Sequence, residues 1–439
     1  MNNLVTAIAR ETELFVGLEY TPGVQVLPTD AAMNLVLAAG AGSVQQMMRQ
    51  MDDPQYRNTL SKLDPIITAF DVGKWNFPTL IKTVAGAGTP APPEIDPLLQ
   101  ALFGLPSDLT QTAWFGNNTR AYLLKPVSPA GTVYPSFSLW SKVGHMMYYV
   151  CGATCNVGEF TIAGNDLCKI AWSGEFMRHG FCGTDAVAAA DTGSGTSLII
   201  EDARKYFLAN SADQFMIQFL DYFTGQPTGV TATVTSINYD TNTLTLLAGV
   251  ARNGGDLVCP YLPTGTELGT PLYGKYGVAR LGGTISSKLL AGLPTTPYIV
   301  QSARMTFTNN LRYHPDLKDN QAYPTEYTAP AARTCEGEIT VFAYRDLPTF
   351  MYKALRDPLY QDYLIIPMQD RNASAGRIAE IHCPRVEWGT PNVGGEDEKT
   401  ATIPFKSTAS PSYNDEAAVV YASAPSSIVS SSTTTTSHS

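Results

Sequence analysis

The sequence predicts a mainly β protein with a few short helices, in which two similar β units flank a small inserted β-domain. The composition is the first observation behind this class. The chain has 36 glycines and 30 prolines, and only 15% of its residues are charged. Such a composition fits a strand- and turn-rich protein with much of its surface pressed against other subunits. At 439 residues the chain is also too long for one small core, so several domains are expected.

The second observation is that one arrangement of strand-like runs occurs twice. Residues 147–176 read as a strand pair, with a cysteine-containing strand, a turn-rich segment and a final alternating strand. Residues 379–407 repeat this layout with different residues. Helices are expected before each copy, at 95–104 and at 347–355. Their apolar residues share one helix side in each case: Ile95, Leu98, Leu99 and Leu102, and then Leu347, Phe350, Met351 and Leu355.

These patterns predict two copies of one unit, which we place at residues 1–185 and 297–422. A small β-domain at 190–292 separates them, because alternating Val, Thr and Leu residues surround a hairpin turn at 238–242. Residues 423–439 are rich in Ser and Thr and predict a flexible tail. Residues 43–57 indicate a helix or an ordered loop. We interpret Gly193–Ser194–Gly195 as part of a linker, because no phosphate-binding context surrounds it.

Charge and hydropathy patterns argue against several functions. A net charge of −10 without a long basic run argues against tight, sequence-specific binding of nucleic acid. The first residues lack a signal-peptide pattern, and no run of about 18 apolar residues predicts a membrane span. Seven cysteines, an odd number, favour free thiols in a reducing compartment over a disulfide framework.

We recognise no catalytic motif in the sequence, so we expect no enzyme activity and no cofactor. Cys151, Cys155, Cys168 and Cys182 with His179 suggest a zinc site, but their spacing differs from that of zinc fingers and ribbons. We interpret them as apolar strand cysteines and expect no metal. An all-β glycosidase, which needs two carboxylates across a cleft, remains an alternative that no residue pattern favours.

The order of elements resembles the tail tube proteins, or major tail proteins, of long-tailed, non-contractile bacteriophages. In the second half the resemblance is carried by ARTCEGEITV (332–341), LPTFMYKAL (347–355), GRIAEIHCPRVEW (376–388) and the segment 400–422. In the first half it is carried by ITAFDVGKWNFPTLIK (67–82), PLLQALFG (97–104) and YYVCGATCNVGEFTI (148–162). The resemblance implies two tandem tail-tube-type β-sandwich units whose strands form the wall of a barrel.

The resemblance also implies a function and partners. Such subunits form rings that stack into a hollow conduit through which DNA passes without specific binding. Two units in one chain favour a ring of three chains, and six is the alternative. The net charge predicts an acidic lumen. Implied partners are further copies of the chain, the tape measure protein and the tail terminator and tip proteins, without membrane insertion. The implied location is the virion tail, assembled in the host cytoplasm.

Two sets of residues are expected to contribute to such an assembly. The barrel-wall candidates are Tyr148, Tyr149, Val150, Phe160, Ile162, Ile381, Val386, Ile403 and Phe405. The long aromatic loop predicts a contact with the neighbouring ring through Tyr313, His314, Pro315, Tyr323 and Tyr327, and a self-packed surface loop is the alternative. A different function also remains open: a phage surface or tail-tip adhesin that binds a host receptor through the 190–292 domain.

Overall fold

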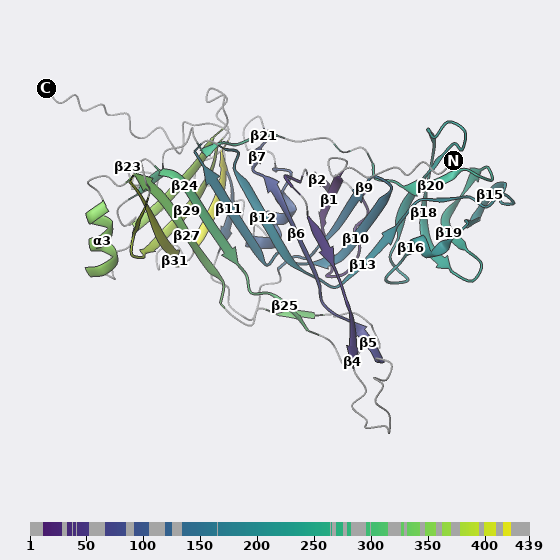
Figure 1. Cartoon of the computed structure of the whole chain (residues 1–439), viewed down its shortest axis with the longest axis horizontal. Helices are drawn as coiled ribbons and strands as arrows, with labels where there is room; N and C mark the ends of the chain where they lie inside the picture. Colours follow the sequence, from purple (N-terminus) through teal and green to yellow (C-terminus); the bar gives the residue numbers. More distant parts are fainter. Residues whose placement is uncertain are drawn as a thin grey trace, which may run out of the picture.

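The computed structural model is an elongated, mainly β molecule with short helices (Figure 1). The structure describes residues 12–28, 33–36, 38–40, 42–51, 66–84, 92–104, 119–124, 134–164, 166–263, 265, 269–274, 279–281, 296–298, 300–314, 326–328, 332–342, 347–356, 362–369, 378–394, 399–409 and 416–422. The predicted mainly β class is confirmed. The predicted tail at 423–439 lies outside the described residues.

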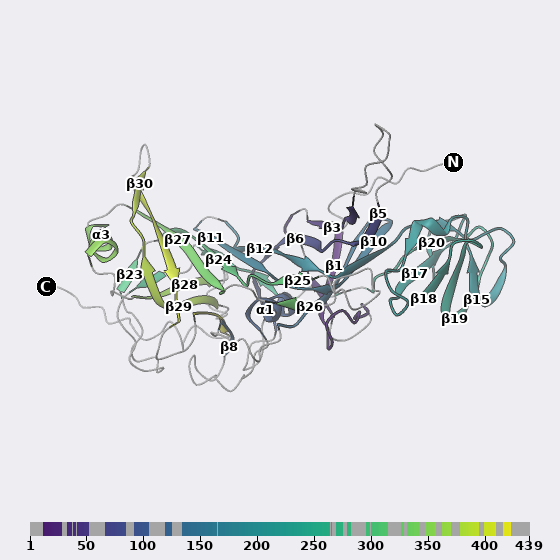
Figure 2. The ribbon, with the colours of Figure 1, turned by 90° about the horizontal axis from the view of Figure 1, so that it is seen from below.

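A 14-stranded sheet contains strands from both halves of the chain and runs along the long axis (Figures 1 and 2). Its path is β23 (Thr296–Tyr298), β22 (Ala279–Leu281), β28 (Asp362–Gln369), β29 (Ile378–Trp388), β31 (Thr400–Ser407), β27 (Thr334–Phe342), β24 (Val300–Thr308), β11 (Val157–Ala163), β12 (Lys169–Phe176), β6 (Gly73–Leu80) and β3 (Ser43–Gln45). Off this path, β30 (Asn392–Gly394) pairs with β31, β32 (Ala417–Ala422) with β29, and β8 (Thr119–Leu124) with β32.

A six-stranded sheet packs against the large sheet. Its order is β16 (Tyr206–Phe207), β13 (Arg178–Cys182), β10 (Met146–Ala153), β9 (Phe137–Val143), β1 (Thr12–Leu18) and β2 (Met33–Val36). Side chains of its inner face, such as Val16, Leu139 and Val150, share one hydrophobic core with Phe160 and Trp172 of the large sheet. The two sheets are therefore the layers of a sandwich around that core.

The stretch 147–176 is a strand pair only in part. β11 pairs with β12, but β10 pairs with β9 and β13 in the other sheet. The expectation that Met147–Val150 pairs within this stretch is wrong. A ribbon of two long strands instead passes from sheet to sheet, because β10 leads into β11 and β12 into β13. Gly152 at the bend has φ of +65°, which favours glycine, and a Cβ on Gly174 would lie 1.8 Å from the Thr154 carbonyl oxygen.

The inserted β-domain is built on a second six-stranded sheet at one end of the molecule (Figure 1). Its order is β14 (Asp185–Ala186), β20 (Leu257–Pro260), β17 (Phe215–Leu220), β18 (Pro227–Asn238), β19 (Thr243–Arg252) and β15 (Gly193–Ile199), and a 3₁₀ turn (Ala203–Lys205) precedes β16. The hairpin predicted around 238–242 joins β18 to β19. The linker interpretation of Gly193–Ser194–Gly195 is wrong, because these residues pair with β19 as an edge strand.

The two halves of the chain repeat one order of strand pairings. In the first half, neighbouring strands follow the order β2-β1-β9-β10-β13, and in the second half β23-β22-β28-β29-β32. In the large sheet, β3-β6-β12-β11 corresponds to β24-β27-β31-β30. Corresponding strands also occur in the same order along the chain. Along the chain, the strands of the inserted sheet lie between these two sets.

Both predicted helices are present at corresponding places in this order. α1 (Asp96–Phe103) has Pro97 in its first turn and ends at Gly104, whose φ is +93°. Ile95, Leu98, Leu99 and Leu102 are fully buried. α3 (Leu347–Arg356) follows β27, but its Met351 and Leu355 are exposed. Of the apolar side expected for this helix, Leu347 is partly buried against the main core, whereas Met351 and Leu355 are not buried by the described part of the chain.

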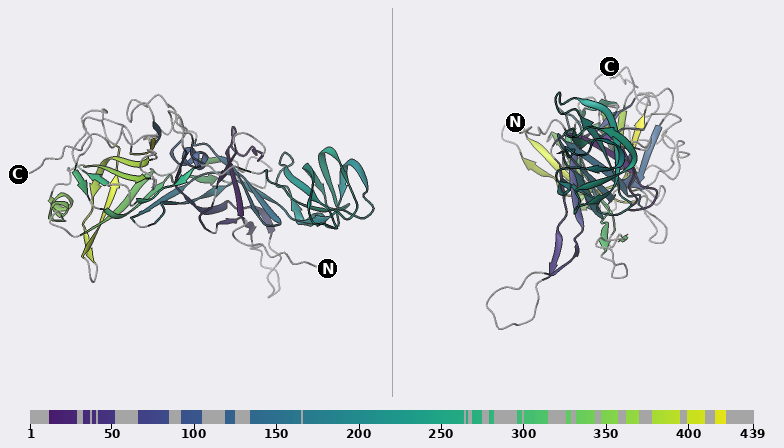
Figure 3. Two further views of the ribbon diagram at one scale, coloured as in Figure 1. Left: turned by 90° about the horizontal axis from the view of Figure 1, so that it is seen from above. Right: turned by 90° about the vertical axis from the view of Figure 1, so that its right-hand side faces the viewer.

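Each half also carries a hairpin ribbon that extends its part of the large sheet. β4 (Met48–Met51) and β5 (Ile66–Phe70) continue β3 and β6, and they project from the body (Figures 1 and 3). β25 (Arg312–His314) and β26 (Glu326–Thr328) continue β24 and β27. The helix-or-loop expectation for 43–57 is therefore wrong where the residues are described, because β3 and β4 are strands. The remaining pair is β7 (Lys82–Thr83) with β21 (Thr270–Pro271).

Candidate interaction surface

The centre of the large sheet has one apolar and one polar face. Side chains of β31, β27, β24, β11, β12 and β6 alternate between the faces. Phe160, Met305 and Ile403 lie on the buried face within the main core. On the opposite face, Thr161, Arg304 and further polar residues such as Asn76, Glu336 and Lys406 are exposed. This continuous polar face, which we call the polar sheet face, is the candidate interaction surface.

Charges on the polar sheet face balance over these six strands. Its basic residues are Lys74, Lys169, Arg304 and Lys406, and its acidic residues are Glu159, Glu175, Glu336 and Glu338. Four positive and four negative side chains give a net charge of zero. The chain's overall charge of −10 therefore arises elsewhere, and this face neither strongly attracts nor strongly repels a polyanion.

Ion pairs connect neighbouring strands across this face. The Arg304 guanidinium donates from Nε and Nη2 to the two Glu159 carboxylate oxygens, at 2.8 Å each. This pair joins β24 of the second half to β11 of the first half. Lys406 Nζ lies 3.4 Å from Glu336 Oε1. Exposed pairs of this kind stabilise a fold by about 0–1 kcal/mol each.

The barrel-wall candidates are divided between two sheets. Phe160 and Ile162 in β11, Ile381 and Val386 in β29, and Ile403 and Phe405 in β31 lie in the large sheet, and all are buried. Tyr148, Tyr149 and Val150 lie in β10 of the six-stranded sheet. Val150 faces the main core and Tyr149 faces the inserted domain. None of the six buried residues in the large sheet is on its polar face.

The predicted inter-ring loop is only partly described. Tyr313 is buried, its hydroxyl donates to the Gly152 carbonyl oxygen, and its amide donates to Glu175 Oε2 at 3.2 Å. These contacts hold Tyr313 against its own chain. His314 is exposed. Pro315 and Tyr323 lie outside the described residues, and for Tyr327 only the backbone, in β26, is described. Docking of this loop on a neighbouring ring stays a prediction.

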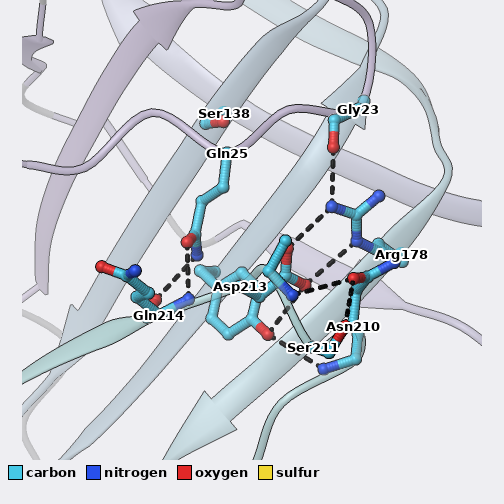
Figure 4. Close-up of polar contacts among 12 residues, drawn as sticks. Gly23, Gln25, Ser138, Arg178, Asn210, Ser211, Asp213 and Gln214 are labelled. Atoms are coloured by element: carbon cyan, nitrogen blue, oxygen red, sulfur yellow. Dashed lines mark hydrogen bonds and ion pairs between the residues drawn. The ribbon is translucent and has the colours of Figure 1, made fainter. Parts of the chain in front are cut away.

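A buried ion pair attaches the inserted domain to the six-stranded sheet (Figure 4). Arg178 in β13 donates to both Asp213 carboxylate oxygens, at 3.0 and 2.7 Å, and to the Gly23 carbonyl oxygen at 2.6 Å. The Tyr149 hydroxyl donates to Asp213 Oδ2 at 3.1 Å. Gln25 and Gln214 exchange two further hydrogen bonds. Around this cluster, apolar residues of both sheets form a second core, so the inserted domain is fixed to the body.

Glu19 is a buried carboxylate beside the same junction. It accepts hydrogen bonds from the Gly23 and Gly152 amides at 2.7 and 2.9 Å, and from Ser136 and Ser138 hydroxyls at 2.6 and 2.8 Å. Burial raises the pKa of Glu19, although these four donors favour its charged form. The carboxylate thereby ties the turn at 19–23 to the bend of the ribbon. Nothing in the local sequence pattern around Glu19, Arg178 or Asp213 indicated this cluster.

The cysteines form no ligand set in the described part of the chain. All seven are buried free thiols. Burial raises the pKa of Cys168 to about 12 and raises the pKa of Cys151 well above its usual value, so these groups stay protonated at neutral pH. Within the described ranges, no cluster of three or more His, Cys, Asp or Glu side chains is arranged to hold a metal ion.

Comparisons of the sequence with known proteins give no match: no protein-family model matches the chain, and no curated protein is significantly similar to it. Among the helices in the described ranges, none has the length and apolar character needed to cross a membrane.

Proposed function

We propose that this chain is a structural subunit of a bacteriophage tail tube. In this proposal the two halves are tandem tail-tube-type units, and the polar sheet face lines a hollow conduit for DNA. Copies of the chain form rings, and rings stack into the tube. The subunit performs no chemistry and takes its place in the virion tail, with the tape measure, terminator and tip proteins as neighbours.

One observation carries the proposal: both halves contribute equivalent strands to a single sheet with one polar face and one buried face. When units are arranged side by side in this way, each added unit lengthens the sheet and leaves an edge to which the next unit can pair. A sheet extended around a closed ring has no free edges, and its polar face becomes a continuous inner wall. Two units in each chain favour a ring of three chains.

The charge of the polar sheet face changes one detail of the proposal. An acidic lumen was expected from the net charge of −10. The described charges of this face sum to zero, so we propose a lumen of alternating charge held in pairs, such as Arg304 with Glu159. A neutral polar wall offers DNA phosphates no strong binding site, which also allows passage without retention.

Electron microscopy and thiol labelling of the purified chain test this function. We expect long hollow tubes with a mass per ring of three chains. In these tubes, a bulky maleimide reagent should not reach a cysteine at Thr161 on the polar sheet face. A matched cysteine at Thr231, exposed on the inserted domain, should react fully. Both positions should react in dissociated chains. Equal labelling of both positions in the assembled state would exclude a lumenal polar sheet face.

A second candidate function is an adhesin that binds a host receptor through the inserted domain. Tyr222 and Phe223 favour it, because they are 64% and 92% exposed on this domain and contact each other edge to face at 5.4 Å between ring centroids. Exposed aromatic residues often mark binding surfaces. Discrete oligomers that bind host cells, with binding lost in Phe223→Ala, would support this function over the tube.

A further inference from the structure

In the described part of the chain, two strands of the repeat each have one unpaired edge, whereas the same edge of the counterpart strand is paired. β24 of the second half pairs with β11 of the first half, and this pairing joins the two halves. The counterpart of β24 is β3, and the counterpart of β11 is β30. Within the described residues, β3 pairs only with β6, and β30 pairs only with β31. One edge of each strand is thus left without a neighbour in that part of the chain.

The hydrogen bonds fix which residues correspond. The Gly389 amide donates to the Pro404 carbonyl oxygen just as the Asn156 amide donates to that of Ser173. Three residues later, Asn392 stands opposite Thr402, and Glu159 stands opposite Ala171. Val393 therefore corresponds to Phe160.

The same comparison aligns the other edge. The pair of Glu175 with Lys74 corresponds to the pair of Lys406 with Glu336. On the next strand, Gln45 stands opposite Lys74, and Thr306 stands opposite Glu336. Val44 therefore corresponds to Met305. In the internal junction, Phe160 stands opposite Met305. The register that joins the halves thus places Val393 opposite Val44.

Exposure separates the internal junction from the two open edges. Phe160 and Met305 are both 0% exposed, whereas Val393 is 49% exposed and Val44 is only partly buried. Val393 and Val44 stand opposite Ala401 and Trp75, so both belong to the apolar face of the sheet. When another strand covers an apolar residue that is half exposed at a strand edge, the free energy of the assembly falls.

We infer that β30 of one chain pairs in antiparallel fashion with β3 of a second copy, with Val393 opposite Val44. This junction repeats the internal β11–β24 junction between chains. The two edges differ from each other, so the contact is head to tail and propagates in one direction until a ring closes. β30 lies at the α3 end of the molecule and β3 lies nearer the inserted domain, so the two edges lie apart from each other (Figure 2). The inference deepens the proposed function by naming the strands that close its ring.

Cysteine cross-linking between two single variants tests the pairing. Val44→Cys and Val393→Cys are prepared separately, mixed under assembly conditions, and bridged by oxidation or by a short thiol-reactive cross-linker. The native cysteines are buried and do not compete. We expect a covalent dimer in the mixture and none with either variant alone. A chain carrying both substitutions should give a ladder whose largest species is the closed ring.

Matched controls make the outcome decisive. Val24→Cys, at a valine with 57% exposure outside both edges, should give no dimer when mixed with Val393→Cys. Circular dichroism confirms that each variant is folded. Cross-linking of Val393→Cys with itself would overturn the head-to-tail pairing, and so would a chain that assembles without cross-linking in the mixture. Cross-linked closed rings that never stack would uphold the pairing and contradict the tube function, whereas tubes without this cross-link would contradict the pairing alone.

Discussion

The two halves of the chain repeat one order of strands but differ in how their equivalent elements are covered. α1 in the first half is buried, and its Phe103 ring contacts Phe307 of the second half at 5.1 Å between centroids. The Asn309 side chain also donates to the Leu102 carbonyl oxygen at 2.7 Å. α3 holds the equivalent place in the second half, yet its Tyr352 and Leu355 are 56% and 66% exposed.

The difference between the helices arises from position, because α1 lies at the junction of the halves and α3 lies beyond it. The uncovered surfaces of the second half, α3 and the β30 edge, correspond to covered surfaces of the first. A residue of α1 or β11 is therefore expected to act on the stability of the single chain, and its counterpart in α3 or β30 on assembly.

Asp213→Ala should have the largest effect, because it disrupts the buried junction between the first half and the inserted domain. The substitution leaves the Arg178 guanidinium, whose side chain is only 10% exposed, without its carboxylate partner. Loss of one member of a buried ion pair costs about 3–5 kcal/mol of unfolding free energy. Urea unfolding of the single chain measures it. Glu159→Ala, which removes an exposed pair on the polar sheet face, is the control and should cost about 0–1 kcal/mol. Equal losses would contradict this contrast.

Leu102→Ala should have the next largest effect and tests α1 directly. Leu102 is fully buried, and a Cβ on Gly158 would lie only 2.5 Å from its Cδ2 atom. Truncation leaves a cavity and should lower the unfolding free energy by about 2–5 kcal/mol. Denaturant unfolding with unchanged m-value would show a simple loss of stability. A loss below about 1 kcal/mol would mean that α1 is not a buried part of the joint core.

A smaller, pH-dependent effect is expected from His179, close to the β3 edge. Its Nδ1 lies 2.8 Å from Gln46 Oε1, and burial lowers the pKa of His179 from its usual 6.5. The unfolded state therefore binds the proton more readily than the folded state between these two pKa values. Stability should fall as the pH drops below about 6.5, with a slope of at most about 1.4 kcal/mol per pH unit. Unfolding of His179→Gln between pH 5 and 8 should lack this component, whereas His145→Gln should retain it.

Leu355→Ala should have the smallest effect on the single chain, about 0.5 kcal/mol or less, because its side chain is exposed. Its effect should appear on assembly instead, since a neighbouring copy would cover α3 as the second half covers α1. Sedimentation across a concentration series should show weaker association than for the unaltered chain. If association is unaltered, α3 is not part of the contact between chains.

The elements that the sequence predicts correctly are those with a strong local period. α1 follows from the spacing of Leu98, Leu99 and Leu102, and the hairpin of the inserted domain follows from its turn and its alternation. β3 is different: Ser43 and Gln45 lie at a sheet edge, where half-exposed positions need no apolar alternation, so no pattern marks the strand. The sheet to which β10 belongs depends on a bend at Gly152, and a strand period carries no information about a bend.

The polar sheet face could not be predicted from single strands, because it depends on which strands are neighbours in one sheet. Alternation indicates that Phe160 and Ile403 face a core, but not that their strands belong to one sheet or which side chains share its polar face. Arg178 and Asp213 are 35 residues apart, and their pairing depends on where the inserted domain packs. Such contacts arise from tertiary geometry, and a single sequence contains no local signal for them.

The bent ribbon also has a mechanical consequence. β12 and β13 are separated only by Met177, so the strand beside the inserted domain continues directly into the large sheet. A pull on the inserted domain from outside would be transmitted along this strand, loading the hydrogen bonds of β12 to β6 and β11 in shear rather than opening them one at a time. Force on the inserted domain would thereby be spread over the sheet that both halves of the chain share.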